Sequence, residues 1–114
     1  MADCLFCKIA RKEIPARIVY EDRQVVAFED LHPQAPTHSL VIPKTHFATL
    51  NDVGAQEEGL LGHMMVVAAR LAKDKRLHDS GYRIVANTLA GAGQSVFHIH
   101  LHLLGGRPFG WPPG

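Results

Sequence analysis

The chain has 114 residues, 46% of them hydrophobic, which suits one globular domain covering residues 1–114. Twelve lysines and arginines against eleven carboxylates give a formal charge of +1, so we expect no nucleic-acid partner and a local site for any phosphate. No segment has the apolar length of a membrane span, and the first residues lack the features of a signal peptide, so we expect no membrane association and a cytoplasmic location.

The first half of the chain predicts a short helix followed by three strands. Asp3 is a good capping residue for a helix from Cys4 to about Lys12, and Pro15 prevents the helix from continuing. Three apolar runs follow, and the polar link between the first two is typical of a hairpin. The predicted strands cover residues 17–20, 25–28 and 38–42.

The second half predicts one long helix and two more strands. The helix begins at Asn51 or Asp52, and its apolar residues recur at the spacing of a core-facing stripe. These residues are Leu60, Leu61, Met64, Val67, Ala68 and Leu71. Strands follow at residues 82–87 and 95–104. Because short links cannot join parallel neighbours, we predict an α+β fold with a five-stranded, mainly antiparallel sheet, the long helix on one face and a short N-terminal helix.

Three of the eight histidines fall on the last predicted strand, at His98, His100 and His102. Alternate side chains of a strand share a face, so these imidazoles are expected together on one side. The apolar residues between them, Phe97, Ile99, Leu101 and Leu103, are expected in the core. The spacing alone leaves three possibilities open: nucleophilic catalysis, a metal site, or a polar surface.

Motifs along nearly the whole chain favour the first possibility. The segment from Gly93 to Arg107 resembles the signature of the histidine triad (HIT) superfamily, and more narrowly that of its histidine triad nucleotide-binding branch. Further matches are Asp3–Ile9, Pro33–His38, Val41–His46, Gly81–Arg83 and Trp111–Gly114. The resemblance implies an α+β domain, a homodimer, and hydrolysis of purine nucleoside phosphoramidates to AMP or GMP and an amine. It implies no organic cofactor.

The resemblance also implies roles for individual residues. His100 matches the family nucleophile, which would form a nucleotidyl-imidazole intermediate that water cleaves. His102 would donate hydrogen bonds to the phosphoryl oxygens, and Ser95 would bond the phosphate or the leaving group. His38 would belong to the proton network; its alternative is a buried histidine with an ordinary structural hydrogen bond.

A second set of residues matches the family's nucleotide contacts. Asp30 would accept hydrogen bonds from the ribose hydroxyls, and the phosphate side would be formed by Asn87, Gly93, Gln94 and Ser95. The base would lie against Phe6, Ile9, Phe28 and Leu31. The chain departs from the common pattern at His32 and in the unusually apolar loop 88–92, so the resemblance does not define the leaving amine.

Cys4 and Cys7 form a Cys-x-x-Cys motif that supplies two of the four ligands of a zinc site. Some branches of the superfamily complete this site with two histidines, here His46 and the first triad histidine, His98. His98 is also a candidate catalytic residue, which would belong to the substrate as much as to the zinc. We therefore expect a structural zinc on these four residues; the alternative is a pair of reduced cysteines packed as small apolar residues. The competing functions are a non-catalytic nucleotide-binding protein, a metal-handling protein that uses the triad itself, and a dinucleoside polyphosphate hydrolase.

Overall fold

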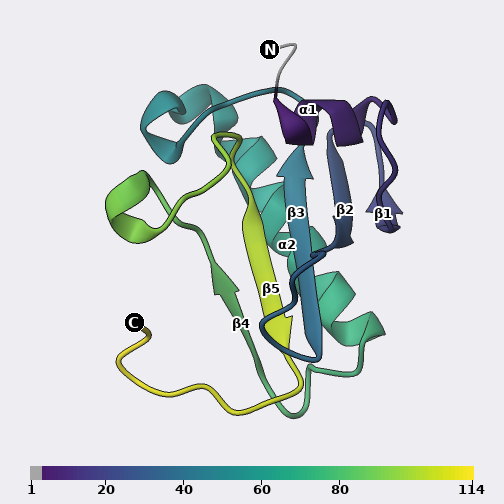
Figure 1. Ribbon diagram of the computed structural model, residues 1–114, viewed down its shortest axis with the longest axis vertical. Coiled ribbons are helices and arrows are strands. Elements are labelled where there is room, and N and C mark those ends of the chain that lie inside the picture. The colour runs from purple at the N-terminus through teal and green to yellow at the C-terminus, as the bar shows by residue number, and fades with distance from the viewer. Residues whose placement is uncertain (1–3) are drawn as a thin grey trace.

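A five-stranded antiparallel sheet forms the centre of the computed structural model, which describes residues 4–114 (Figure 1). The strands lie in the order β1-β2-β3-β5-β4 across the sheet. Their bounds are β1 Ile18–Glu21, β2 Val25–Glu29, β3 Thr37–Pro43, β4 Tyr82–Val85 and β5 Leu101–Gly105. This architecture confirms the predicted α+β class. The predicted cap, Asp3, lies outside the described residues.

The long helix α2, Glu58–Asp74, covers one face of the sheet. Its predicted stripe is confirmed, with Leu60 and Leu61 partly buried and the other four residues buried. The stripe packs against sheet residues that point to the same side: Val25, Ala27, Val41, Leu101 and Leu103. No helix within residues 4–114 is long and apolar enough to cross a membrane.

The short helix α1, Leu5–Ala10, lies over the opposite face of the sheet. Cys4 occupies its N-cap, where Sγ accepts a hydrogen bond from the backbone N–H of Cys7. The helix buries Phe6 and Ile9 against a second apolar cluster, formed by Val26, Phe28, Leu40 and Ile42. Because these strand residues alternate with those that face α2, each of β2 and β3 contributes to both cores.

The hairpin between β1 and β2 is fixed by Asp22. Its Oδ1 accepts the backbone N–H groups of Gln24 and Val25 at 2.8 and 2.9 Å. Its Oδ2 accepts hydrogen bonds from Tyr20 Oη at 2.7 Å and from His63 Nε2 of α2 at 2.6 Å. One carboxylate therefore closes the turn and ties the hairpin to the long helix.

Replacing Asp22 with asparagine is expected to destabilise the protein by about 1 kcal/mol at neutral pH, because Oδ2, the charged acceptor for Tyr20 and His63, is lost. Burial alone would raise the pKa of Asp22, but the hydrogen bonds from His63, Tyr20 and the two backbone amides hold it well below its usual range. This stabilisation is complete above the pKa of about 4 in the unfolded chain, and it disappears as the pH falls through the lower pKa of the folded state. Urea unfolding of both proteins from pH 7 to pH 2 measures it; a difference that does not shrink in acid contradicts the prediction.

Three predicted boundaries are wrong: the strand predicted at 82–87 ends two residues early, at Val85, and two element starts differ by six residues or more. The long helix does not begin at Asn51 or Asp52: residues 50–57 form two 3₁₀ turns, η1 Leu50–Asp52 and η2 Ala55–Glu57. Thr49 and Asp52 cap η1 reciprocally, and Val53 and Gly54 are then extended, so the chain changes direction before α2.

The last strand is also shorter than the predicted 95–104, because β5 begins only at Leu101. The segment before it pairs outside the sheet, with the N–H of Ile99 donating to the carbonyl of Phe47 at 2.8 Å. The strict alternation therefore fails at one position. Ile99, Leu101 and Leu103 are buried as predicted, whereas Phe97 is 46% exposed.

Candidate active site

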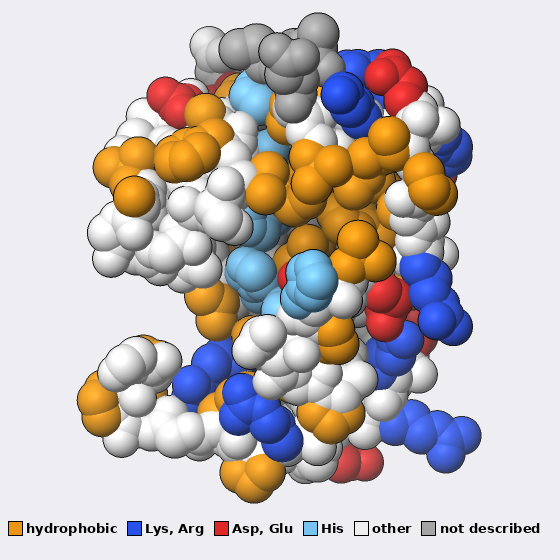
Figure 2. Space-filling view, in the orientation of Figure 1, with side chains coloured by type: hydrophobic (Ala, Val, Ile, Leu, Met, Phe, Trp, Pro, Cys, Tyr) orange, Lys and Arg blue, Asp and Glu red, His pale blue; other side chains and the backbone are white. Residues whose placement is uncertain are grey.

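The three triad histidines occupy the upper half of β5 and the segment that leads into it. His102 pairs with Leu40 of β3 and with Val85 of β4, while His98 and His100 precede the strand. His98 is fully buried, His100 is 7% exposed and His102 is partly buried. Figure 2 shows histidine side chains running down a hollow, with an apolar surface along the side where α1 and β2 lie in Figure 1.

His100 is held in one tautomer by its own backbone. Its Nδ1 lies 2.7 Å from the carbonyl oxygen of His98, and a carbonyl only accepts, so Nδ1 carries the proton. The lone pair is therefore on Nε2. The ring of Phe6 packs edge-on against the imidazole, with centroids 5.1 Å apart. Burial lowers the pKa of His100, and the neutral imidazole is the form that can attack an electrophile.

His38 fixes the tautomer of His102 in the same way. The backbone N–H of Gln34 donates to Nδ1 of His38 at 3.0 Å, so the proton of His38 is on Nε2. This Nε2 lies 2.9 Å from Nδ1 of His102 and donates to it. His102 consequently carries its own proton on Nε2. Burial lowers the pKa of His38, and burial with the neighbouring His100 and His38 lowers that of His102 to about 4, so both rings are neutral at pH 7.

Asp30 lies at the end of this chain of imidazoles. Its Oδ1 accepts the backbone N–H of His32 at 2.8 Å, and its Oδ2 lies 3.5 Å from Nε2 of His38. The carboxylate is about one-fifth exposed, so free lone pairs remain open to hydroxyl donors. His32, which departs from the family pattern, is exposed beyond the Asx turn that Asp30 makes.

The loop between β4 and His98 contains all four predicted phosphate-side residues. Ser95 and Gly93 are exposed and Asn87 is half-buried, whereas Gln94 is buried with its amide bonded to backbone. Oε1 of Gln94 accepts the N–H of Leu89 at 2.7 Å, and Nε2 donates to the carbonyls of Ala48 and Val96. The Gln94 side chain therefore shapes the loop. Gly93 adopts φ 91°, a conformation that favours glycine.

The structure brings together three of the four residues predicted to line a base pocket. Phe6, Ile9 and Phe28 belong to one buried cluster, and the rings of Phe6 and Phe28 are 5.4 Å apart. The fourth, Leu31, is 87% exposed and lies outside that cluster. These first three residues form an apolar floor beside the triad, where Phe6 packs against His100.

Four predicted metal ligands also converge. Cys4, Cys7, His46 and His98 offer ligand atoms that all lie within 4.8 Å of one another. His98 Nδ1 is 3.4 Å from Cys4 Sγ, 3.6 Å from Cys7 Sγ and 3.1 Å from His46 Nδ1, and Cys7 Sγ is 3.4 Å from His46 Nδ1. A tetrahedron with zinc bond lengths has edges of about 3.6 Å between sulfur and nitrogen and about 3.3 Å between nitrogens. The donor set therefore fits a zinc ion.

His98 links the cysteine cluster to the triad. Its Nε2 donates to the carbonyl of Pro43 at 2.8 Å, which leaves Nδ1 as a free ligand atom, and burial lowers its pKa to about 4. Its own carbonyl holds His100. The contacts from Gln34 and Pro43 could not be predicted from the sequence, because they come from backbone groups that no side-chain pattern reveals.

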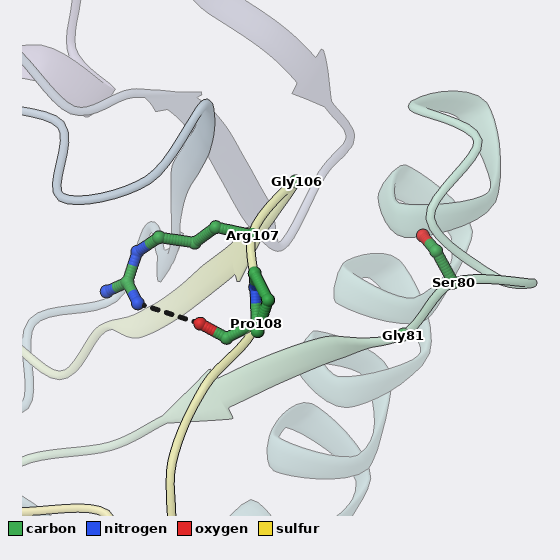
Figure 3. Close-up of a pocket in the computed structure, with 5 residues that line it drawn as sticks. All are labelled: Ser80, Gly81, Gly106, Arg107 and Pro108. Atoms are coloured by element: carbon green, nitrogen blue, oxygen red, sulfur yellow. Dashed lines mark hydrogen bonds between the residues drawn. The ribbon is translucent and has the colours of Figure 1, made fainter.

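A separate cavity of about 380 Å³ lies beyond the end of β5 (Figure 3). It is lined by Ser80, Gly81, Gly106, Arg107 and Pro108. These residues include no histidine, cysteine or carboxylate, and Arg107 already donates to the carbonyls of Gln34 and Pro108. The acid–base and nucleophilic groups are instead gathered at the triad.

Comparisons with known proteins agree with the geometry. The family model described as HIT domain matches residues 11–109. A purine nucleoside phosphoramidase of Escherichia coli is 52% identical over 108 residues, 95% of this chain and 91% of that protein. The crystal structure of a HIT family hydrolase from Legionella pneumophila is 55% identical, with a TM-score of 0.97 and coverage of 98% and 100% of the two chains. A histidine triad protein from Clostridium difficile is 44% identical, with a TM-score of 0.93 and coverage of 96% of each chain.

Proposed function

The chain belongs to the HIT domain family. From this premise we propose that it is a hydrolase of purine nucleoside phosphoramidates. The products would be AMP or GMP and a free amine. The curated relative at 52% identity carries the name of this activity, and it aligns over almost the whole length of both proteins. One observation carries the assignment to a site: the 2.7 Å hydrogen bond from His100 Nδ1 to the His98 carbonyl, which leaves Nε2 free to attack phosphorus.

In the first step, Nε2 of His100 forms a bond to the α-phosphorus while the P–N bond breaks. His102 donates its Nε2–H to a phosphoryl oxygen as negative charge develops, because His38 keeps that proton in place. The leaving nitrogen takes up a proton, since an amine anion is too basic to depart. The exposed hydroxyl of Ser95, which exchanges with solvent, is the proposed route for this proton.

In the second step, water attacks the nucleotidyl-imidazole, and the N–P bond to His100 breaks. The water supplies the oxygen of the released monophosphate and returns one proton to solvent, so that the two steps together consume one water. Splitting the displacement in this way replaces one difficult step by two easier ones. Asp30, placed beside His38, would accept hydrogen bonds from the ribose hydroxyls, while Phe6, Ile9 and Phe28 provide the apolar floor for the purine.

A panel of substrates tests the assignment. AMP and GMP phosphoramidates of one simple amine, and a dinucleoside tetraphosphate, are incubated separately with the protein and followed by phosphorus NMR. We expect the two phosphoramidates to be hydrolysed with kcat/KM of order 10⁴ M⁻¹s⁻¹ or higher, the usual range for enzymes on good substrates. Faster hydrolysis of the tetraphosphate would indicate the rival hydrolase activity. AMP binding without turnover of any substrate would indicate a nucleotide-binding protein instead.

We further propose that zinc occupies the cluster of Cys4, Cys7, His46 and His98, as the donor atoms and their spacing favour. When bound there, zinc supplies a cross-link between the N-terminal helix and the start of the triad. It does not take part in the displacement. Both cysteines are free thiols in the structure, and thiolate ligands need a reducing environment, which supports a cytoplasmic location.

A homodimer is the proposed assembly. β4 lies at the edge of the sheet, with the partly exposed Tyr82 at its start, and α2 exposes Met65 and Val66. An open strand edge and exposed apolar side chains are two features suited to pairing with a second copy.

A further inference from the structure

The loop on one side of the triad is uncharged and displays two large apolar side chains. No Asp, Glu, Lys or Arg occurs between Arg83 and Arg107. Within this stretch Leu89 is 47% exposed and Phe97 is 46% exposed. Neither side chain belongs to the two cores of the fold.

Leu89 is held in a conformation that leucine rarely adopts, with φ 70° and ψ 169°. Three hydrogen bonds enforce it: its N–H donates to Oε1 of Gln94, and its carbonyl accepts from the N–H groups of Ala92 and Gln94. Gln94 in turn is anchored to Ala48. Such strain persists only where the surroundings fix it, and it is concentrated at ligand-binding sites. The loop therefore holds the exposed Leu89 side chain in one fixed orientation.

The chain places this loop next to the reacting atoms. Ser95, the proposed phosphate or leaving-group contact, lies between Gln94 and Phe97, and His100 follows three residues after Phe97. In Figure 1 the green loop with η3, Ala90–Ala92, lies on the side of β5 opposite α1. In Figure 2 the lobe on that side of the histidines is mostly white, with no blue side chain beside the hollow. In-line attack by Nε2 of His100 would expel the amine from the opposite side of phosphorus. With the purine against Phe6, this loop is the wall left to receive that amine.

We propose that Leu89 and Phe97 form an apolar lip that selects phosphoramidates whose leaving amine carries an uncharged, apolar chain. The inference rests on the proposed function and defines its substrate class. An apolar chain loses water-exposed surface against the two side chains, whereas a charged chain would be desolvated there without a partner. Both effects are the same in the ground state and in the transition state, so the selection acts on KM and leaves kcat nearly unchanged.

Three AMP phosphoramidates of similar length test the proposal, with n-pentylamine, 4-aminobutyrate or 1,4-diaminobutane as the leaving amine. For the natural chain we expect kcat/KM to be about tenfold higher for the pentyl substrate than for either charged one, with the difference in KM. In Leu89→Lys and in Phe97→Lys, the preference for pentylamine over 4-aminobutyrate should fall to about threefold or less. Ser80→Lys, which adds the same charge at an exposed position beyond the other end of β5, should keep the original preference.

For each protein the measured quantity is the ratio of kcat/KM between two substrates. The fraction of folded protein cancels in this ratio, so a variant that is only partly folded still gives a valid result. Equal kcat/KM for all three substrates in the natural chain would overturn the lip while leaving the hydrolase assignment intact. An unchanged preference in both lysine variants would overturn it as well. No hydrolysis of any of the three would contradict the proposed function, and the lip with it.

Discussion

Replacing His100 with alanine is expected to reduce kcat for an AMP phosphoramidate by about 10⁴-fold or more while the fold is retained. The expectation follows from the tautomer that the structure fixes. Nδ1 of His100 is committed to the His98 carbonyl, so Nε2 is the nucleophilic atom, and alanine supplies no substitute for it. Steady-state kinetics on the purified variant measure the loss, with circular dichroism to compare the fold.

The covalent intermediate gives a second readout of the same prediction. Rapid acid-free quenching followed by mass spectrometry should find a nucleotidyl group on the peptide that contains His100 in the natural chain and none in the alanine variant. His78→Ala is a matched control, because His78 is an exposed histidine outside the triad and should retain full activity. Turnover near the natural rate in the His100 variant would rule out His100 as the nucleophile. A nucleotidyl group found on another residue would transfer the role to that residue.

The sheet could be predicted from the sequence because its signals are local. Strands at residues 17–20, 25–28 and 38–42 were each within one residue of the observed bounds, since apolar runs flanked by turn residues define them. The long helix was recognised by its stripe, which depends on one face only. Its start was wrong, because Thr49 and Asp52 form a closed 3₁₀ turn that resembles a helix N-terminus in sequence.

The histidine segment shows the limit of a pattern based on alternation. His98 to Leu103 alternate as a strand does, but only the residues from Leu101 onward pair with neighbours in the sheet. Before that point the chain bonds to Phe47, and Phe97 turns outward. Alternation predicts which side chains lie on opposite faces of an extended segment. It does not predict which backbone groups form hydrogen bonds, or with which strand.

The positions of the protons on the histidines could not be predicted from the residue types in the sequence. The three triad histidines and His38 each have a fixed tautomer because one ring nitrogen meets a backbone group or another fixed imidazole. The backbone partners come from Gln34, Pro43 and His98, whose side-chain types are irrelevant to the contact. By contrast, the cysteine–histidine cluster was expected from the family resemblance, and the four side chains do meet. Resemblance could assign these roles because it carries tertiary information that spacing in one sequence lacks.

Loss of the zinc is expected to destabilise the protein strongly. The protein, purified without added metal and washed with a weak chelator, should retain about one zinc per chain, because a closed site with four ligands binds tightly. Cys7→Ser should lose the metal and lower the thermal midpoint by roughly 10 °C or more, which corresponds to a loss of about 3 kcal/mol in a domain of this size. Elemental analysis and calorimetry measure the two effects. Leu5→Ser, an exposed change on the same short helix, should leave both unchanged.

Zinc loss should also lower kcat, by about tenfold, although no zinc ligand reaches the substrate in the proposed reaction. The connection is His98, whose Nδ1 would bind the metal, whose Nε2 bonds to Pro43 and whose carbonyl orients His100. Without the metal, one of these constraints is released, and the nucleophile is oriented less well. His46→Ala should therefore reproduce the effects of Cys7→Ser, because His46 contacts the cluster and not the triad pair His38–His102.

Variants of the triad separate a structural zinc from a metal held by the catalytic histidines. His102→Ala should abolish most activity and keep the zinc, since His102 is not among the four clustered ligands. If the metal were instead lost with His102 and retained without Cys7, the triad itself would be the metal site. Less than about half a zinc per chain in the washed natural protein would argue against a tight closed site. The pair of cysteines would then be packed as small apolar side chains beside His98, and His100 would depend on the protein matrix alone for its orientation.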